Sequence, residues 1–137
     1  TGIYELRSGS GYRGRLIQFI FDITPDTPVP PNNIDVFAFY INLDGHTEQY
    51  LLSHIAALNG LIHLTKPTTS GWSYADFISP KGGLCAVHFD SSGNIDRFIG
   101  ILYLDCDWKD SFDLNIQGLD TANPVSGTVW SELTYYI

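Results

Sequence analysis

Positive charge, cysteine and methionine are scarce in this chain. Its 137 residues include 7 Lys and Arg against 15 Asp and Glu, which gives a formal net charge of −8 at pH 7. Proteins that bind nucleic acids carry a basic stripe or patch, and here only Arg7, Arg13 and Arg15 lie near one another. We interpret these three arginines as a neutralising patch on a solvated face, so no nucleic-acid partner is expected.

Long apolar runs are absent as well. No stretch reaches the roughly 18 apolar residues that a membrane span requires, and no basic segment followed by an apolar one marks a signal peptide. The chain starts at Thr1 instead of Met, which is typical of a processed protein or of a domain excised from a larger one. The composition leaves open a virion surface, a cell surface and the cytoplasm as its location.

The two cysteines, Cys85 and Cys106, flank a turn at residues 90–94. This pattern predicts a hairpin between residues 84–89 and residues 98–105. Closing that turn places Cys85 opposite residues 99–102, several residues away from Cys106. The offset exceeds the Cα separation that a disulfide tolerates. We therefore expect two free thiols, which is typical of a reducing compartment or of a fold that does not depend on a bridge.

Hairpin signals dominate what the sequence does contain. Asp44-Gly45 and Asn59-Gly60 each lie between apolar runs, and both dipeptides favour two-residue turns in which the central residues have positive φ. Pairing across Asp44-Gly45 places Phe39 opposite Tyr50 and Phe37 opposite Leu52. These signals predict antiparallel strands and an all-β domain.

Residues 48–59 support two interpretations. As a strand, the segment uses both glycine turns; as a short helix, it has Leu51, Ile55 and Leu58 at helical spacing, with Gly60 to end it. Neither alternative changes the fold class.

The rest of the chain predicts about nine strands in a single domain over residues 1–137. Residues 7–11 are expected to turn between two strands of a first hairpin, and the Pro-rich residues 24–33 are expected to form a long loop. Short strands separated by turn residues are typical of an antiparallel β-sandwich, a jelly roll or a closed barrel. The last strand, residues 128–137, is a candidate edge strand for a homodimer.

Four aspartates lie within nine residues after a predicted strand: Asp105, Asp107, Asp110 and Asp113. Carboxylates crowded on one loop are the ligands that Ca²⁺ prefers. The run lacks the order of a helix-loop-helix calcium site, so an ordinary acidic loop is the simpler interpretation. A calcium site is the one cofactor hypothesis that the sequence supports.

Catalytic motifs are missing. No nucleophile elbow, phosphate-binding glycine loop or dinucleotide fingerprint occurs. If residues 58 and 61 pair, His54 and His63 fall on neighbouring strands, and His88 lies on another. An alternative hypothesis is therefore a small β-barrel enzyme, an isomerase or cyclase, that uses an inward His or Asp for acid–base chemistry.

Aromatic residues beside glycine, serine and aspartate point to recognition instead of catalysis. Rings next to polar groups suit both sugar stacking and protein interfaces. We expect a non-catalytic domain that binds a glycan or a protein receptor through loops and an exposed sheet face. It would be a lectin, or a surface domain of a larger assembly such as a viral coat protein. The candidate ligand-binding residues are Trp72, Tyr74, Trp108, Asp105, Asp107 and Asp110.

Overall fold

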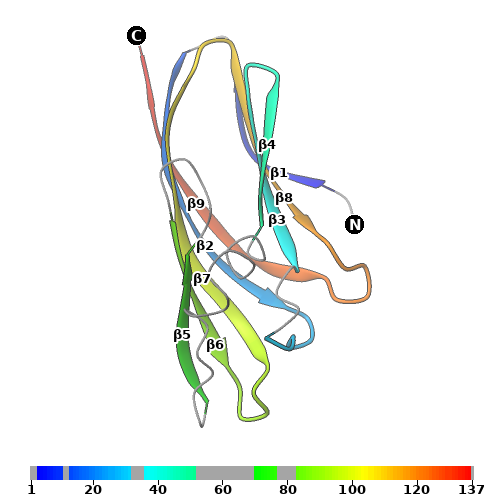
Figure 1. Ribbon diagram of the computed structural model, residues 1–137. Helices are drawn as coiled ribbons and strands as arrows, with labels where there is room; N and C mark the ends of the chain where they lie inside the picture. The colour runs from blue at the N-terminus through cyan, green and yellow to red at the C-terminus, as the bar shows by residue number, and fades with distance from the viewer. Residues whose placement is uncertain (1–2, 11–12, 32–35, 52–69, 77–82, 137) are drawn as a thin grey trace.

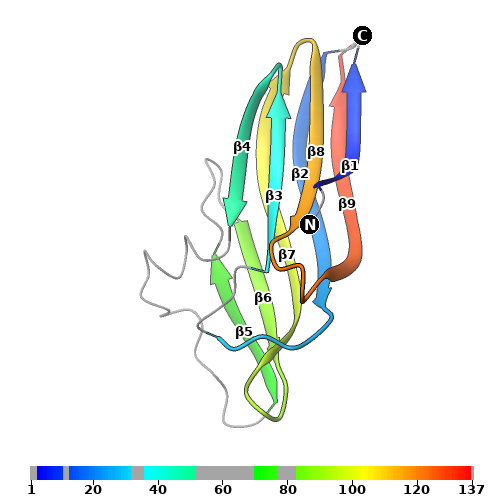
Figure 2. The same ribbon diagram turned by 90° about the vertical axis from the view of Figure 1, so that its right-hand side faces the viewer.

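The computed structural model of the chain describes residues 3–10, 13–31, 36–51, 70–76 and 83–136. Within these ranges the protein forms nine β-strands and contains no helix. Figures 1 and 2 show that the strands lie in two layers. The strands are β1 (Ile3–Ser10), β2 (Gly14–Pro25), β3 (Phe37–Leu43), β4 (His46–Leu51), β5 (Gly71–Asp76), β6 (Gly83–Phe89), β7 (Ile95–Trp108), β8 (Ser111–Gly118) and β9 (Val125–Tyr135).

Every neighbouring pair of strands is antiparallel. One sheet has four strands in the order β1-β8-β3-β4, and the other has five in the order β5-β6-β7-β2-β9. In the described part of the chain the sheets are separate and neither closes on itself, so the predicted all-β class is confirmed, whereas the closed barrel and the jelly roll are not. The arrangement is a sandwich-like double layer.

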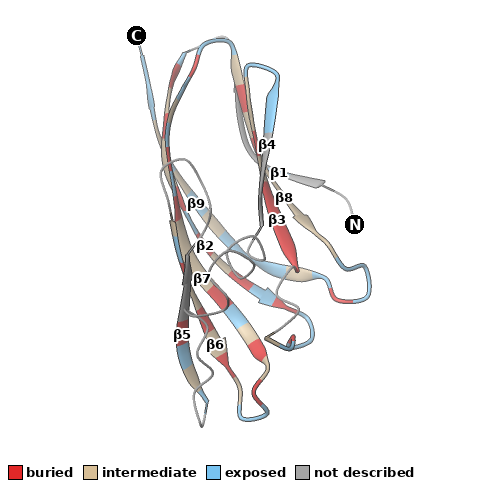
Figure 3. Cartoon of the chain, in the orientation of Figure 1, coloured by how far each residue is buried: buried red, intermediate tan, exposed pale blue. Residues whose placement is uncertain are grey.

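Phenylalanines join the inner faces of the two sheets. Phe19 and Phe21 of β2 contact Phe39 of β3 with ring centroids 4.6 and 5.1 Å apart, and Phe37 of β3 lies 5.4 Å from Phe98 of β7. All five rings are at most 1% exposed, and Figure 3 shows buried residues on strands of both layers. Each such aromatic pair adds about 0.5–1.5 kcal/mol to the gain from burial.

Gly100 of β7 makes room for one of these rings. It pairs directly with Phe21. A Cβ at Gly100 would come within 2.5 Å of Phe21 Cζ and of the Leu84 carbonyl oxygen. The missing side chain is therefore what lets Phe21 lie flat against β7.

The predicted turn at Asp44-Gly45 is confirmed together with its register. Phe39 pairs with Tyr50, and both turn residues have positive φ, at 52° and 92°. Residues 48–51 belong to strand β4. The pairing of Phe37 with Leu52, the Asn59-Gly60 turn and the helix alternative beyond residue 51 lie outside the described residues.

The hairpin around residues 90–94 is confirmed as well. Cys85 pairs with Gly100, within the predicted range, and both Cys85 and Cys106 are free thiols. The Asp90 carboxylate accepts hydrogen bonds from the N–H groups of Ser92 and Asn94 at 2.9 and 3.0 Å. This loop is an ordinary turn held by its own aspartate.

The expected first hairpin is wrong. β1 continues through Ser10 and pairs with β8, whereas β2 pairs with β7 and β9 in the other sheet. The glycine-rich residues 7–11 therefore do not turn one strand back on the other. β2 already has a neighbour on each side, so β1 finds its partner along β8 instead.

The Pro-rich segment is anchored in its described part. Val29 is 4% exposed and exchanges two backbone hydrogen bonds with Ile95, at 2.8 and 2.7 Å. Thr27 donates its N–H to the Asn123 side-chain oxygen at 2.7 Å and accepts from the same side chain at 2.9 Å. A long loop was predicted here, and part of it packs against the core.

Gly100→Ala should destabilise the protein by about 1–3 kcal/mol, because the added methyl group overpacks the core against Phe21. Urea unfolding followed by far-UV circular dichroism measures the change. Gly118→Ala is the matched control: the nearest atom to its Cβ would be Val125 Cγ2 at 4.0 Å, so its stability should stay within about 0.5 kcal/mol of the parent. Equal stability of the two variants would contradict the packing described for Phe21.

The two thiols should differ sharply in reactivity. Cys85 is fully buried, and burial raises the pKa of its thiol far above the ordinary range, so little reactive thiolate forms. A Cys106→Ala variant should therefore resist a thiol reagent in the native state and react once urea unfolds it. Rapid labelling of that variant in native buffer would show that Cys85 is not buried.

Candidate functional site

The acidic run lies in a strand, not in the predicted loop. β7 extends to Trp108, and its side chains alternate: Asp105 and Asp107 are exposed, whereas Cys106 is half-buried and Trp108 is buried. The turn to β8 contains only two residues, Lys109 and Asp110. The outward carboxylates therefore belong to the five-stranded sheet.

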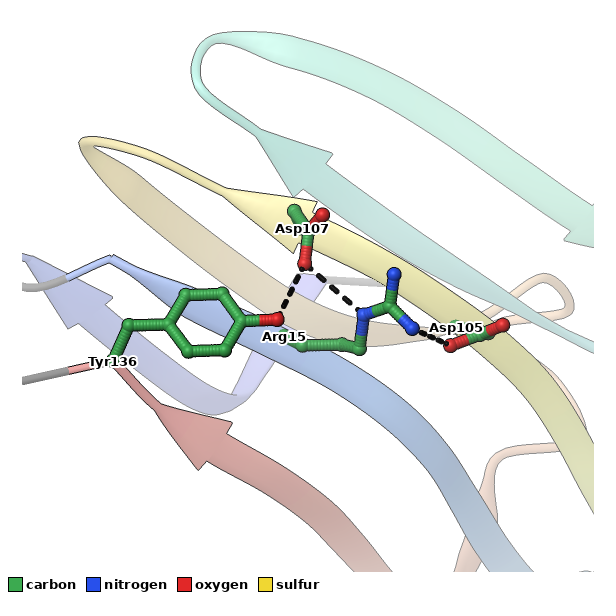
Figure 4. Close-up of polar contacts among 4 residues, drawn as sticks. All are labelled: Arg15, Asp105, Asp107 and Tyr136. Atoms are coloured by element: carbon green, nitrogen blue, oxygen red, sulfur yellow. Dashed lines mark hydrogen bonds and ion pairs between the residues drawn. The ribbon is translucent and has the colours of Figure 1, made fainter.

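Arg15 of β2 joins both outward carboxylates (Figure 4). Its Nη1 lies 2.6 Å from Asp105 Oδ1, and its Nε lies 3.1 Å from Asp107 Oδ1. The hydroxyl group of Tyr136 also donates to Asp107 Oδ1 at 3.0 Å. Hydrogen bonds from Arg15 and then from Tyr136 lower the pKa of Asp107, and the carboxylate raises the pKa of Arg15. This cluster ties the ends of three strands together, and of the three arginines considered in the sequence Arg15 is the one that forms it.

A register shift and an uncommon backbone angle together bring Asp105 into this position. Between the pairs Leu16–Cys106 and Gln18–Tyr103, β7 has one residue more than β2, so the register shifts. Asp105 has φ of +45°, which is uncommon for a residue other than glycine. Bulges increase local twist and redirect side chains, and here one directs the Asp105 carboxylate to Arg15.

The other two aspartates of the calcium hypothesis lie elsewhere. Asp110 is in the turn after β7, and Asp113 is on β8, opposite Asn42 in the four-stranded sheet. Asp105 and Asp107 are engaged by Arg15. Among the described residues no group of three or more His, Cys, Asp or Glu side chains could hold a metal ion. The proposed calcium site at Asp105, Asp107, Asp110 and Asp113 is therefore wrong, because alternation and the change of sheet separate the carboxylates.

Trp108 is not a surface residue. It is 1% exposed, with its ring centroid 4.5 Å from that of Phe112 and 5.6 Å from that of Tyr135. A Cβ at Gly14 would collide with this indole. The prediction that Trp108 contacts a ligand is wrong, because the strand parity that points Asp107 outward points Trp108 into the core.

Trp72 of β5 is a surface residue. It is 45% exposed, and its ring lies 4.9 Å from that of His88, edge to face. His88 Nδ1 is 2.6 Å from Asp96 Oδ1. Tyr74 follows two residues later, and its backbone pairs with Ala86; its side chain lies outside what the structure describes.

The inward histidine of the enzyme hypothesis is not provided by His88. Its neighbours Val87 and Phe89 are buried in the core, whereas the His88 side chain is 29% exposed and pairs with Asp96 on the opposite side of the sheet. His54 and His63 lie outside the described residues.

One apolar row crosses the outer face, by which we mean the side of the five-stranded sheet that faces away from the four-stranded sheet. Ile20 of β2 pairs with Trp130 of β9 and with Ile101 of β7, and Ile101 pairs with Leu84 of β6. Four neighbouring strands thus present aligned apolar side chains. At about 4.8 Å between strands, the row is about 14 Å wide.

Exposed large apolar side chains gather on this face. Among the described residues seven are exposed; five of them belong to the outer face, and a sixth, Tyr136, bonds to Asp107 at its end. The five are Ile20 (39%), Trp72 (45%), Leu84 (43%), Tyr103 (43%) and Trp130 (55%). Of these five, Trp72 is a predicted ligand-binding residue, and Trp130, beside Ser131, has the same pattern of an aromatic ring next to a polar residue. Ile20 lies between Phe19 and Phe21. An uninterrupted apolar run of this kind indicates that both faces of the strand have apolar side chains, and this is the feature of the sequence that points to Ile20.

No protein-family model matches the chain, and a search of curated proteins gives no significant match. The described residues also form no helix long and apolar enough to cross a membrane. The functional argument therefore rests on the geometry of the outer face.

Asp44 fastens two turns that lie side by side at one end of the sandwich (Figure 2). Its carboxylate accepts hydrogen bonds from the N–H groups of Lys109 (3.0 Å), Asp110 (2.7 Å) and Ser111 (3.2 Å). Its own N–H donates to the Ser111 carbonyl at 3.0 Å. The three N–H donors lower the pKa of Asp44, with Asp110 contributing most.

Asp44→Ala should therefore lower the melting temperature at pH 7. Because the folded state lowers the pKa of Asp44, its contribution is complete above the ordinary carboxyl pKa of about 3.9 and is lost as the pH falls through the lower folded value. The difference between parent and variant, followed by calorimetry, should shrink below about pH 4. Asp110→Ala, which removes an exposed carboxylate from the adjoining β7–β8 turn, is the control and should keep the parent's melting temperature. A difference for Asp44→Ala that is independent of pH would contradict the role of its carboxylate.

Proposed function

We propose that this chain is a non-catalytic recognition domain that binds a protein receptor through the outer face of its five-stranded sheet. The observation that carries the proposal is the alignment of Trp130, Ile20, Ile101 and Leu84 across four strands. Soluble monomers rarely expose contiguous apolar patches of more than a few hundred Å² unless the patch is an interaction site.

The surroundings of the row resemble the border of an interface. Gln18 and Glu132 bond to each other at 3.1 Å on one side of it, and Arg97 and Asp22 form an ion pair on the other. Protein interfaces commonly combine an apolar, aromatic-rich centre with a polar rim. Trp and Tyr are over-represented among the residues that dominate binding, and this face has Trp130, Trp72 and Tyr103.

The composition of the row favours a protein over a glycan. Sugar recognition combines an aromatic face with polar groups that fix hydroxyls, but Ile20, Ile101 and Leu84 provide neither. Trp72, beside His88 and Asp96, is the part of the face most like a sugar-binding site, and it lies at the margin of the row. A glycan-binding lectin is thus the less favoured form of the proposal.

The proposed setting is a surface domain of a larger assembly, such as a viral coat protein, or a free-standing binding protein. Two-sheet jelly rolls are the architecture of many capsid and lectin domains. This is an analogy of fold class, and function is argued from the site.

Trp130→Ala and Ile20→Ser should each weaken receptor binding by about tenfold or more, since central interface anchors commonly contribute more than about 1.4 kcal/mol. The parent is first screened against an array of membrane-protein ectodomains and, in parallel, against a glycan array. The affinities of the variants for the protein that binds are then measured by surface plasmon resonance.

Tyr40→Ala is the matched control. It removes an aromatic ring from β3 in the other sheet, where the Tyr40 hydroxyl group donates to Gln117 at 2.9 Å, and binding should be unchanged. Loss of glycan binding in Trp72→Ala with no effect of Trp130→Ala would replace the protein receptor by a glycan. Binding that none of these variants changes, or no binding on either array, would contradict the proposal.

A further inference from the structure

The outer face has an acidic border around its apolar row. Among the described side chains that form polar pairs on this face, five are carboxylates and two are guanidinium groups, so negative charge is in excess within these pairs. The carboxylates belong to Asp22, Asp96, Asp105, Asp107 and Glu132, and the guanidinium groups to Arg15 and Arg97.

Both cations are engaged by carboxylates of the face itself. Arg97 bonds to the two oxygens of Asp22 through Nε at 3.0 Å and Nη2 at 2.7 Å. Arg15 instead joins two carboxylates, bonding to one oxygen of Asp105 and one oxygen of Asp107. A partner that approaches the face therefore meets two guanidinium groups already neutralised by their own carboxylates.

One carboxylate of the border, that of Glu132, bonds to a neutral group. Glu132 bonds to the neutral Gln18 amide, and no cation pairs with it in the described part of the chain. It lies next to Trp130, one row away from Ile20. Asp107 shares Arg15 with Asp105. Glu132 and the Asp105–Asp107 pair thus lie on the same side of the apolar row, toward the Arg15 end of β2.

We infer that the partner presents an apolar strip bordered by lysine or arginine side chains, an inference that rests on the proposed function and names the class of its receptor surface. Complementary potentials increase association rates and exclude partners of the wrong charge. Apolar side chains of the partner would cover Ile20, Ile101 and Trp130, while its cations would meet Glu132 and the Asp105–Asp107 pair.

Charge argues against a second copy of the chain on this face. Two outer faces brought together would place their acidic borders against each other, and each chain has a net charge of −8. Like charges across an interface are unfavourable. The occupant is therefore a different, basic protein surface.

Three synthetic amphipathic peptides of about 18 residues test this class of partner. They share one strip of Leu and Ile, and its borders have Lys, Gln or Glu. Each is titrated to about 1 mM into the isotopically labelled full chain and followed by two-dimensional NMR. The Lys-bordered peptide should bind at least about tenfold more tightly than the Gln-bordered peptide, and the Glu-bordered peptide least. Shifts should centre on Ile20, Ile101 and Trp130.

A variant that removes one charge distinguishes the contribution of the acidic border to peptide binding from that of the apolar row. Glu132→Gln should lower the affinity for the Lys-bordered peptide severalfold and leave the affinity for the Gln-bordered peptide unchanged. Asp113→Asn makes the same change of charge on β8 in the other sheet and should affect neither. Increasing salt should weaken only the Lys-bordered peptide.

The outcomes distinguish this inference from the proposed function. Equal binding of the Lys and Gln peptides at the face would overturn the acidic border and leave the apolar recognition face standing. Binding of none of the peptides, or self-association through the face in sedimentation, would overturn the partner class. Failure of the proposed function would appear in the array experiment instead, as no binding on either array or as a receptor whose binding is unchanged by Trp130→Ala and Ile20→Ser.

Discussion

The contact between β2 and β3 through phenylalanine side chains is the constraint on which the rest of this structure depends. Phe19 and Phe21 meet Phe37 and Phe39 across the two layers with centroid separations of 4.6 to 5.8 Å. Because β2 has β7 on one side and β9 on the other, anchoring its inner face orients the middle of the five-stranded sheet. Because successive side chains of a strand point to opposite faces, the Ile20 side chain then points outward. The exposed row is thus a consequence of how the core is packed.

Local signals predicted the parts of the fold that are local. The Asp44-Gly45 turn and the hairpin around Ser92-Gly93 came out with the right register, because turn chemistry fixes which residues face each other. The pairing of β1 was not predictable in this way. Its partner β8 lies about a hundred residues along the chain, and a glycine-rich stretch such as residues 7–11 can either turn a hairpin or link two sheets. Only the competition for the edges of β2 decides between them.

The type of candidate site was predictable from the sequence, but most of the residues that form it were not. An exposed sheet face was expected, and Trp72 lies on it. The predictions for Trp108 and the four aspartates are wrong because a dense acidic run favours a loop, whereas Asp105-Cys106-Asp107-Trp108 alternates polar and apolar residues as a half-buried strand does. Trp130, beside Ser131, has the predicted pattern of an aromatic ring next to a polar residue, although it was not among the candidate ligand-binding residues. Ile20 was missed, since an apolar residue flanked by core residues can be told from core only when its strand is placed. The positive φ of Asp105 leaves no trace in the sequence.

The exposure of the three tryptophans tests the account most directly. Brief hydroxyl-radical oxidation of the native protein, localised by mass spectrometry, measures all three in one experiment. The structure predicts rapid modification of Trp130 and Trp72, and protection of Trp108 until the protein unfolds. Oxidation of Trp108 as fast as that of Trp130, or protection of Trp130 in the free chain, would contradict the assignment of the outer face as the surface open to a partner.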